Sequence, residues 1–246
     1  MYFIRSGEAE DPRRRLLVRA LAAGLFSVGL LPARTYAQNV LGGRPAKLPP
    51  GQSIYRVAGE VLINGKSATL QTRIGPTDTI QTGKDAEIVY VVGESSFILR
   101  GESSVTLESP GAGSPLLSGF RIVTGALLSV FPKGRQLRLA TQTATIGIRG
   151  TGVYVEAEPS RTYFCTCYGI ADVTATNDAK SKETVEATHH DRPLYILADE
   201  KPGRSIREAP FINHTDQELT LIEALAGRTP PFIFPKDDYG GPRREY

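Results

Sequence analysis

The residues with the clearest chemical potential are two cysteines and a short histidine-rich stretch that follows them. Cys165 and Cys167 are the only cysteines among 246 residues, and they lie in the run Tyr163-Phe164-Cys165-Thr166-Cys167-Tyr168. This run is rich in aromatic residues, which predicts a strand. Side chains i and i+2 of a strand point to the same face, so the sequence predicts two thiols side by side.

Two of the three histidines, His189 and His190, stand directly before Asp191. If this stretch neighbours the cysteine strand, two sulfurs, an imidazole and the Asp191 carboxylate could surround a zinc or copper ion. Adjacent histidines of a strand face opposite ways, so only one would join unless the chain turns there. His214 is expected to be a solvated loop residue.

Other interpretations of the same residues stay open. The cysteines could pack as small buried hydrophobes, serve thiol-redox chemistry, or form a strained disulfide in an oxidising compartment. The disulfide is awkward, because i and i+2 Cα atoms of a strand lie ~6.6 Å apart, near the upper limit for a bridge. The C-x-C spacing matches no established zinc pattern such as C-x₂-C.

Catalytic motifs are absent from the sequence. It contains no G-x-S-x-G elbow and no H-E-x-x-H helix. A Ser-His-Asp arrangement through His189 or His190 and Asp191 remains conceivable, but no serine is singled out for it. We therefore expect a non-catalytic protein.

The elements that must position these residues read as short strands separated by turns. Asn64-Gly65 between two apolar runs predicts a hairpin, because both central residues of a type I′ turn need positive φ. Breaks are also expected at Gly147 to Gly152 and between Tyr168 and Ala171. Further strands are expected over residues 86–92, 97–100, 105–107, 120–131, 136–140, 153–157, 161–168 and 171–175. The pattern indicates an all-β sandwich, barrel or solenoid.

A family resemblance rests on three segments. They are Gly59-Glu60-Val61 with Asn64-Gly65, then the run from Ile74 to Gly83 followed by Ala86-Glu87-Ile88, and the late run Thr143-Ala144-Thr145-Ile146-Gly147-Ile148-Arg149-Gly150-Thr151. Over roughly residues 54–176 the chain resembles the FecR domain family. It departs at Gly75-Pro76-Thr77-Asp78, where the family's usual Gly-Asp is split by two residues.

The resemblance implies a FecR-like β-sandwich or a β-helix-like stack of short strands, working in protein recognition or signalling in the periplasm. The best-studied members sense an outer-membrane receptor and control a sigma factor through a cytoplasmic N-terminal tail. Only about fifteen residues precede the apolar core here, too few for such a domain. Within the shared motif, Gly147 and Gly150 are expected to allow tight turns or close strand approach, as is Gly152. Arg149 is expected to tie a neighbouring carbonyl or carboxylate, and Thr151 completes the motif.

The first 37 residues read as an export signal. Arg13-Arg14-Arg15 precedes an uncharged stretch over residues 20–31, and Thr35-Tyr36-Ala37 offers a small-residue cleavage site. The paired arginines resemble a twin-arginine signal. Cleavage after Ala37 predicts a periplasmic or secreted protein without a stable membrane span, because the apolar stretch is shorter than the ~20 residues that cross a bilayer.

The charge balance argues against nucleic acid as a partner. The formal charge of the whole chain is +3, and residues 1–37 contain six arginines against three acidic residues. The remaining chain is therefore neutral overall, without the basic excess that binding to phosphates needs. The expected partner is an envelope protein or a cell-wall polymer.

The remaining chain divides into three parts. Residues 38–52 form a linker rich in Pro and Gly, residues 53–200 the FecR-like β-domain, and residues 201–246 a C-terminal helix with an irregular tail. The helix is expected from Thr215-Asp216-Gln217-Glu218, which fits a capping box. Leu219, Ile222 and Leu225 or Ala226 follow as an apolar stripe, expected to seal the β-domain, and Gly227 ends it.

Overall fold

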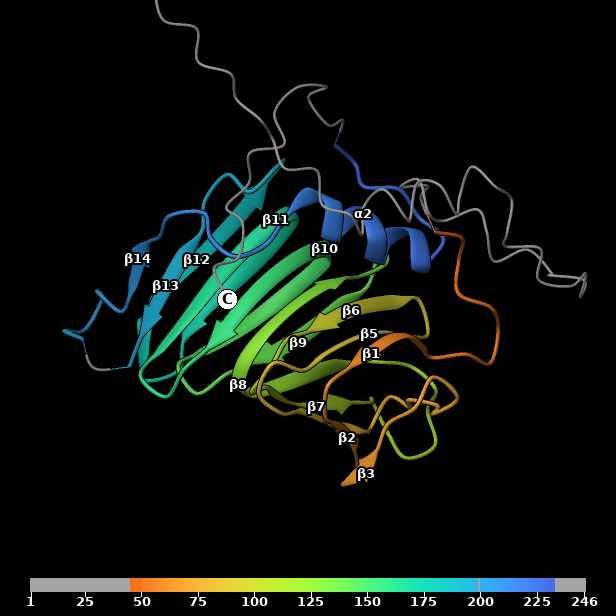
Figure 1. The fold of residues 1–246 in the computed structure, drawn as a ribbon. Helices are drawn as coiled ribbons and strands as arrows, with labels where there is room; N and C mark the ends of the chain where they lie inside the picture. The colour runs from red at the N-terminus through yellow and green to blue at the C-terminus, as the bar shows by residue number, and fades with distance from the viewer. Residues whose placement is uncertain (1–44, 199, 233–246) are drawn as a thin grey trace, which may run out of the picture. The chain divides into compact units, whose positions relative to one another are not determined.

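The computed structural model describes residues 45–198 and 200–232. These residues form fourteen strands, which belong to a single sheet that folds back on itself, and one helix (Figure 1). The predicted signal peptide, residues 1–37, lies outside these residues, as do most of the tail and the first part of the linker. Within the described ranges, no helix combines the length and the apolar character that a membrane crossing requires.

The folded sheet has two halves, and three long strands run through both of them. They are β8 (Gly119–Val130), β10 (Ala144–Ala157) and β11 (Arg161–Ala175). The C-terminal part of β8 and of β10, with the N-terminal part of β11, belongs to one half, and the opposite parts belong to the other. These strands therefore connect the two halves.

The half that carries the cysteines is completed by β1 (Ile54–Ala58), β5 (Glu87–Val92), β6 (Ser95–Leu99), β13 (Leu194–Leu197) and β14 (Ile206–Glu208). The other half contains β2 (Val61–Ile63), β3 (Lys66–Ser67), β4 (Thr79–Thr82), β7 (Ser104–Glu108), β9 (Gln136–Ala140) and β12 (Asp178–Ala187). All pairings are antiparallel except that of β8 with β9.

Alternation along the strands separates two apolar clusters. In β11, Phe164 belongs to the core shared by both halves, whereas Cys165 and Cys167 belong to a second cluster on the outer face. Helix α2 (Asp216–Leu225) covers this outer face with Leu219, Ile222 and Leu225. The expectation that the apolar stripe seals the β-domain is confirmed.

Local signals predicted several elements correctly. Asn64 and Gly65 both have positive φ, at 51° and 77°, and connect β2 to β3 as the hairpin prediction required. The second strand of that hairpin, expected over residues 66–73, is shorter and ends at Ser67. Helix α2 begins with the predicted capping box between Thr215 and Glu218 and is followed by Gly227 at φ +79°.

The two predicted breaks in the long strands are wrong. Strand β10 runs through Gly147 to Gly152, and β11 runs through Gly169, where the prediction placed a break. The glycines bend these strands without ending them, because each strand keeps a ladder partner on both sides of the bend. Register shifts between Arg149 and Val153 mark the bend in β10.

The family-motif residues behave differently from one another. Gly150 has φ +54°, and a Cβ there would lie 2.7 Å from the Cα of Lys133, so both observations require glycine. A Cβ at Gly147 would meet nothing closer than 3.8 Å, so the prediction of a tight approach there is wrong. Arg149 forms an ion pair with Asp172 across the β10–β11 ladder. Thr151 lies within strand β10.

Candidate metal centre

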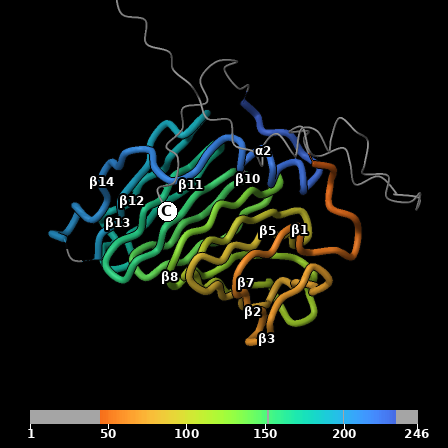
Figure 2. The backbone as a smooth tube through the Cα atoms, viewed as in Figure 1, coloured from red at the N-terminus to blue at the C-terminus, as the bar shows by residue number. Residues whose placement is uncertain are grey.

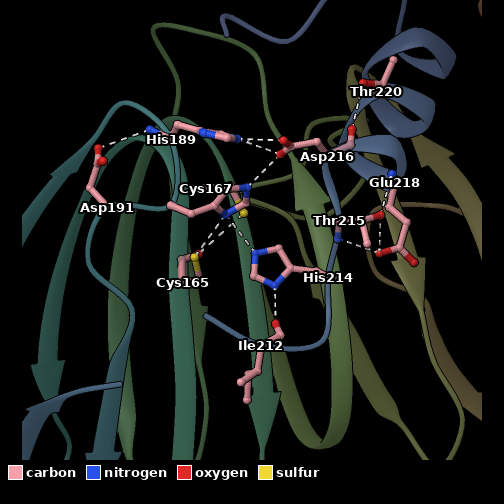
Figure 3. Close-up of polar contacts among 11 residues, drawn as sticks. Cys165, Cys167, His189, Asp191, Ile212, His214, Thr215, Asp216, Glu218 and Thr220 are labelled. Atoms are coloured by element: carbon pink, nitrogen blue, oxygen red, sulfur yellow. Dashed lines mark hydrogen bonds and ion pairs between the residues drawn. The ribbon is translucent and has the colours of Figure 1, made fainter. Parts of the chain in front are cut away.

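Four side chains converge beneath the start of helix α2. One donor atom from each of Cys165, Cys167, His190 and His214 lies within 4.8 Å of the others (Figure 3). Cys165, Cys167 and His214 are fully buried, and the His190 side chain is 8% exposed. Both cysteines are free thiols.

Three structural elements bring these donors together. Strand β11 presents both sulfurs on its outer face, as the alternation of the strand predicted. The turn after β12 presents His190, and the segment that enters α2 presents His214, which directly precedes the N-cap residue Thr215. Figure 2 shows this last segment passing from β14 across the sheet to α2, and the Ile212 amide on it donates to the Tyr163 hydroxyl of β11 at 3.3 Å.

The chain turns at the two adjacent histidines, which removes the restriction expected for a strand. His190 adopts a left-handed conformation at φ +55°, which His tolerates better than most residues. Its backbone amide donates to the Cys167 carbonyl at 2.9 Å, so the turn is attached to the cysteine strand. The two histidine side chains can therefore face the same carboxylate.

That carboxylate belongs to Asp216. His190 Nε2 lies 3.0 Å from Asp216 Oδ1, and His189 Nε2 lies 2.8 Å from Asp216 Oδ2. Asp191 lies outside the donor set, because its Oδ2 accepts the backbone amides of Thr188 at 2.6 Å and His189 at 3.2 Å. The prediction chose Asp191, the adjacent residue, and missed Asp216.

The prediction that His214 is solvated is wrong. Its ring is fully buried and stacks on Tyr154 with 4.4 Å between the centroids. Phe211 packs against it at 4.5 Å and against His190 at the same distance. Aromatic rings therefore pack against both imidazoles. In the sequence, the only signal for a role of His214 was that it is one of three histidines and stands beside a capping box.

Hydrogen bonds assign the tautomer of each donor histidine. His214 Nδ1 lies 2.7 Å from the Ile212 carbonyl, which can only accept, so this nitrogen carries the proton and Nε2 is left with a lone pair. The Asp216 carboxylate also accepts, so His190 carries its proton on Nε2 and has a lone pair on Nδ1. These two nitrogens face each other at 3.1 Å. Two lone pairs at this distance repel unless a proton or a metal ion lies between them.

Without a metal, a proton satisfies the cluster. Burial opposes charge on His190, but hydrogen bonds to Asp216 and Cys165 prevail and raise its pKa to about 9. A hydrogen bond from Cys167 holds the pKa of Cys165 well below its usual value, assisted by His190 and His214 and opposed by burial. Burial, with the neighbouring Cys165, raises the pKa of Cys167. These shifts favour an imidazolium at His190 beside a Cys165 thiolate and a Cys167 thiol.

Two of the distances between donor atoms are close to those around a tetrahedral zinc ion. Zn–N bonds of about 2.05 Å and Zn–S bonds of about 2.3 Å place two ligand nitrogens about 3.4 Å apart, and a nitrogen and a sulfur about 3.6 Å apart. The observed values are 3.1 Å between the two nitrogens and 3.5 Å from Cys165 Sγ to His190 Nδ1. Each ring also donates a hydrogen bond from its other nitrogen, to the Asp216 carboxylate or the Ile212 carbonyl, as zinc-bound histidines usually do. The residues therefore fit a zinc ion.

Comparisons with known proteins give little further information. No family model matches the chain, and no curated protein matches it. Two crystal structures of a protein from Parabacteroides distasonis ATCC 8503, described as a "putative anti-sigma factor", align with a TM-score of 0.40 and 11% identity. Each alignment covers 53% of this chain and 58% of that protein.

Proposed function

We propose that this protein is an exported, non-catalytic β-domain that binds one zinc ion through Cys165, Cys167, His190 and His214. The observation that supports it most is the facing pair of ring nitrogens, each left with a lone pair by the hydrogen bond that the same ring donates on its other side. In this proposal, the ion replaces the buried proton.

Charge favours zinc over copper in its Cu⁺ state. Two thiolates and two neutral imidazoles balance the charge of Zn²⁺, whereas Cu⁺ would leave a net negative charge among aromatic rings. An uncompensated charge in such surroundings is costly. Four protein ligands also leave no open coordination position, the arrangement typical of structural and not catalytic zinc.

Metal analysis of the mature protein, purified without chelator, tests the proposal. We expect one equivalent of zinc in the wild type and none in the Cys165→Ser, Cys167→Ser double variant. Thr166→Ser is the matched control, because Thr166 lies between the cysteines but on the opposite face of the strand, and it should retain zinc. A metal-free wild type would reject the zinc site. If its mass were also lower by two hydrogens, the thiol-redox interpretation would replace it.

Recognition of an envelope protein or a cell-wall polymer is a second candidate function, and the sheet edge at β14 supports it. In the described residues, β14 pairs only with β13 and is the last strand of the sheet, with Arg207 and Glu208 exposed. An open edge can accept an extended segment of another chain through backbone hydrogen bonds.

Site-specific cross-linking in envelope extracts tests the recognition hypothesis. A photo-reactive amino acid at Arg207 should give a discrete adduct. The same group at Gln71, which is exposed on a loop after β3, is the control and should give none. Equal labelling from both positions would reject β14 as a recognition edge.

A further inference from the structure

The four donors of the proposed zinc site come from two separable parts of the molecule. Cys165, Cys167 and His190 belong to the sheet and to a turn that is hydrogen-bonded to it. His214 belongs to the C-terminal segment, defined here as residues 209–227, which contains α2. Asp216, the first residue of α2, accepts hydrogen bonds from the sheet-bound histidines. An ion in this site would therefore join the segment to the sheet.

The C-terminal segment covers an apolar surface. Leu219, Ile222 and Leu225 of α2 pack in one cluster with side chains of β5, β6, β8 and β10. The strand residues in this cluster, all nearly inaccessible to solvent, are Val89, Ile98, Leu128, Val130 and Tyr154. Removal of the segment would expose these side chains.

Polar contacts other than the site also hold the segment in place. Arg100 Nη2 bonds the Asn213 carbonyl at 2.7 Å and Glu218 at 3.2 Å. Near the other end of α2, the buried Glu223 accepts from the Tyr168 hydroxyl and pairs with Arg228 at 2.6 Å. The contacts of Arg100 lie at the N-terminal end of α2, as the site does, and those of Glu223 lie near its other end.

The helix depends on its docking. Helix α2 has ten residues, and isolated helices of this length are marginal in water because nucleation is unfavourable. Without an ion, the turn and the segment are joined by the hydrogen bonds from His189 and His190 to Asp216. An ion would add coordinate bonds to both parts, through His190 and His214.

We propose that zinc acts as a clasp that fixes the C-terminal segment on the sheet, so that loss of the ion releases α2 and uncovers the outer apolar face. This inference rests on the proposed zinc site and adds that occupancy of the site determines the position of α2. The helix is then the metal-responsive element of the molecule.

Hydrogen–deuterium exchange of the mature wild-type chain, with one equivalent of zinc and after chelation, tests the clasp. We expect the amides of residues 219–226 to exchange at least about tenfold faster after chelation, and those of β8 and β10 to stay unchanged. Metal content is measured on the same samples. Equal exchange of the helix in samples verified as loaded and metal-free would overturn the clasp and leave the zinc site standing. Absence of bound zinc in the loaded sample would overturn both.

Two variants separate the clasp from general loosening. His214→Gln removes the only donor on the segment, and its helix should exchange fast with zinc present. His189→Gln removes a histidine that contacts Asp216 but is not a donor, and its helix should keep the zinc-dependent protection. The reverse pattern would overturn the clasp. The wild-type comparison decides the question if His214→Gln does not fold.

Discussion

At the residue scale, Asp216 occupies a more important position than its sequence suggests. Its carboxylate orients His190 for the proposed ion, holds His189 and begins helix α2. Hydrogen bonds from both histidines lower its pKa despite the opposing effect of burial, so the carboxylate stays charged. Carboxylates behind zinc-bound histidines fix the tautomer and strengthen the ligand.

Asp216→Asn should therefore weaken zinc binding by about 10- to 100-fold without removing a ligand. Competition against a chelator of known affinity measures this change. Asp191→Asn is the matched control, because Asp191 accepts only backbone amides of the same turn, and its affinity should stay close to that of the wild type. Equal losses in the two variants would mean that the turn, and not the Asp216 carboxylate, sets the affinity.

At the element scale, Gly152 lets β10 pass close to Tyr168 of β11. A Cβ at Gly152 would lie 2.6 Å from the Tyr168 ring, which stands directly after Cys167 in the next strand. Real Cβ atoms do not approach carbon this closely, so a substitution must move the ring or the strand. Gly147, five residues earlier in the same strand, has no such contact.

Gly152→Ala should lower the free energy of unfolding by about 1–3 kcal/mol, the usual cost of overpacking a core. Gly147→Ala should have almost no effect, since its Cβ meets only ordinary contacts. Urea denaturation of the two variants beside the wild type measures both values. A Gly147→Ala variant that loses as much stability as Gly152→Ala would contradict the assignment of strain to the Tyr168 contact.

At the scale of the whole molecule, one continuous sheet folds into two halves around a shared core, and α2 closes the outer face of one half. The end of the predicted linker takes part in this closure, because the Leu48 amide donates to the Leu225 carbonyl at 3.0 Å and the Leu48 side chain is buried against α2. The packed unit therefore begins before the predicted boundary at residue 53.

Export followed by cleavage makes a separate prediction for the whole chain. Protein recovered from the periplasm should begin at Gln38, because the apolar stretch ends in a small-residue cleavage site at Ala37. Intact mass of the fractionated protein checks the site. Replacing both Arg14 and Arg15 with lysine distinguishes the routes, since only a twin-arginine signal should fail with this charge-conserving change. An uncleaved chain in the cytosol would contradict export.

The sequence alone determined what depends on neighbours a few residues apart. The hairpin at Asn64-Gly65, the capping box at Thr215 and the shared face of Cys165 and Cys167 all follow from backbone geometry over two to four residues. The all-β class follows from the same local rules, applied repeatedly along the chain.

Only the tertiary structure decided which residues complete the site. His214 and Asp216 reach the cysteines because α2 packs across the outer face of the sheet, and His189 and His190 share a carboxylate because the chain turns after β12. Glycines in β10 and β11 bend the strands because ladders continue on either side of them. These outcomes depend on pairing and packing between distant segments, about which local spacing contains no information.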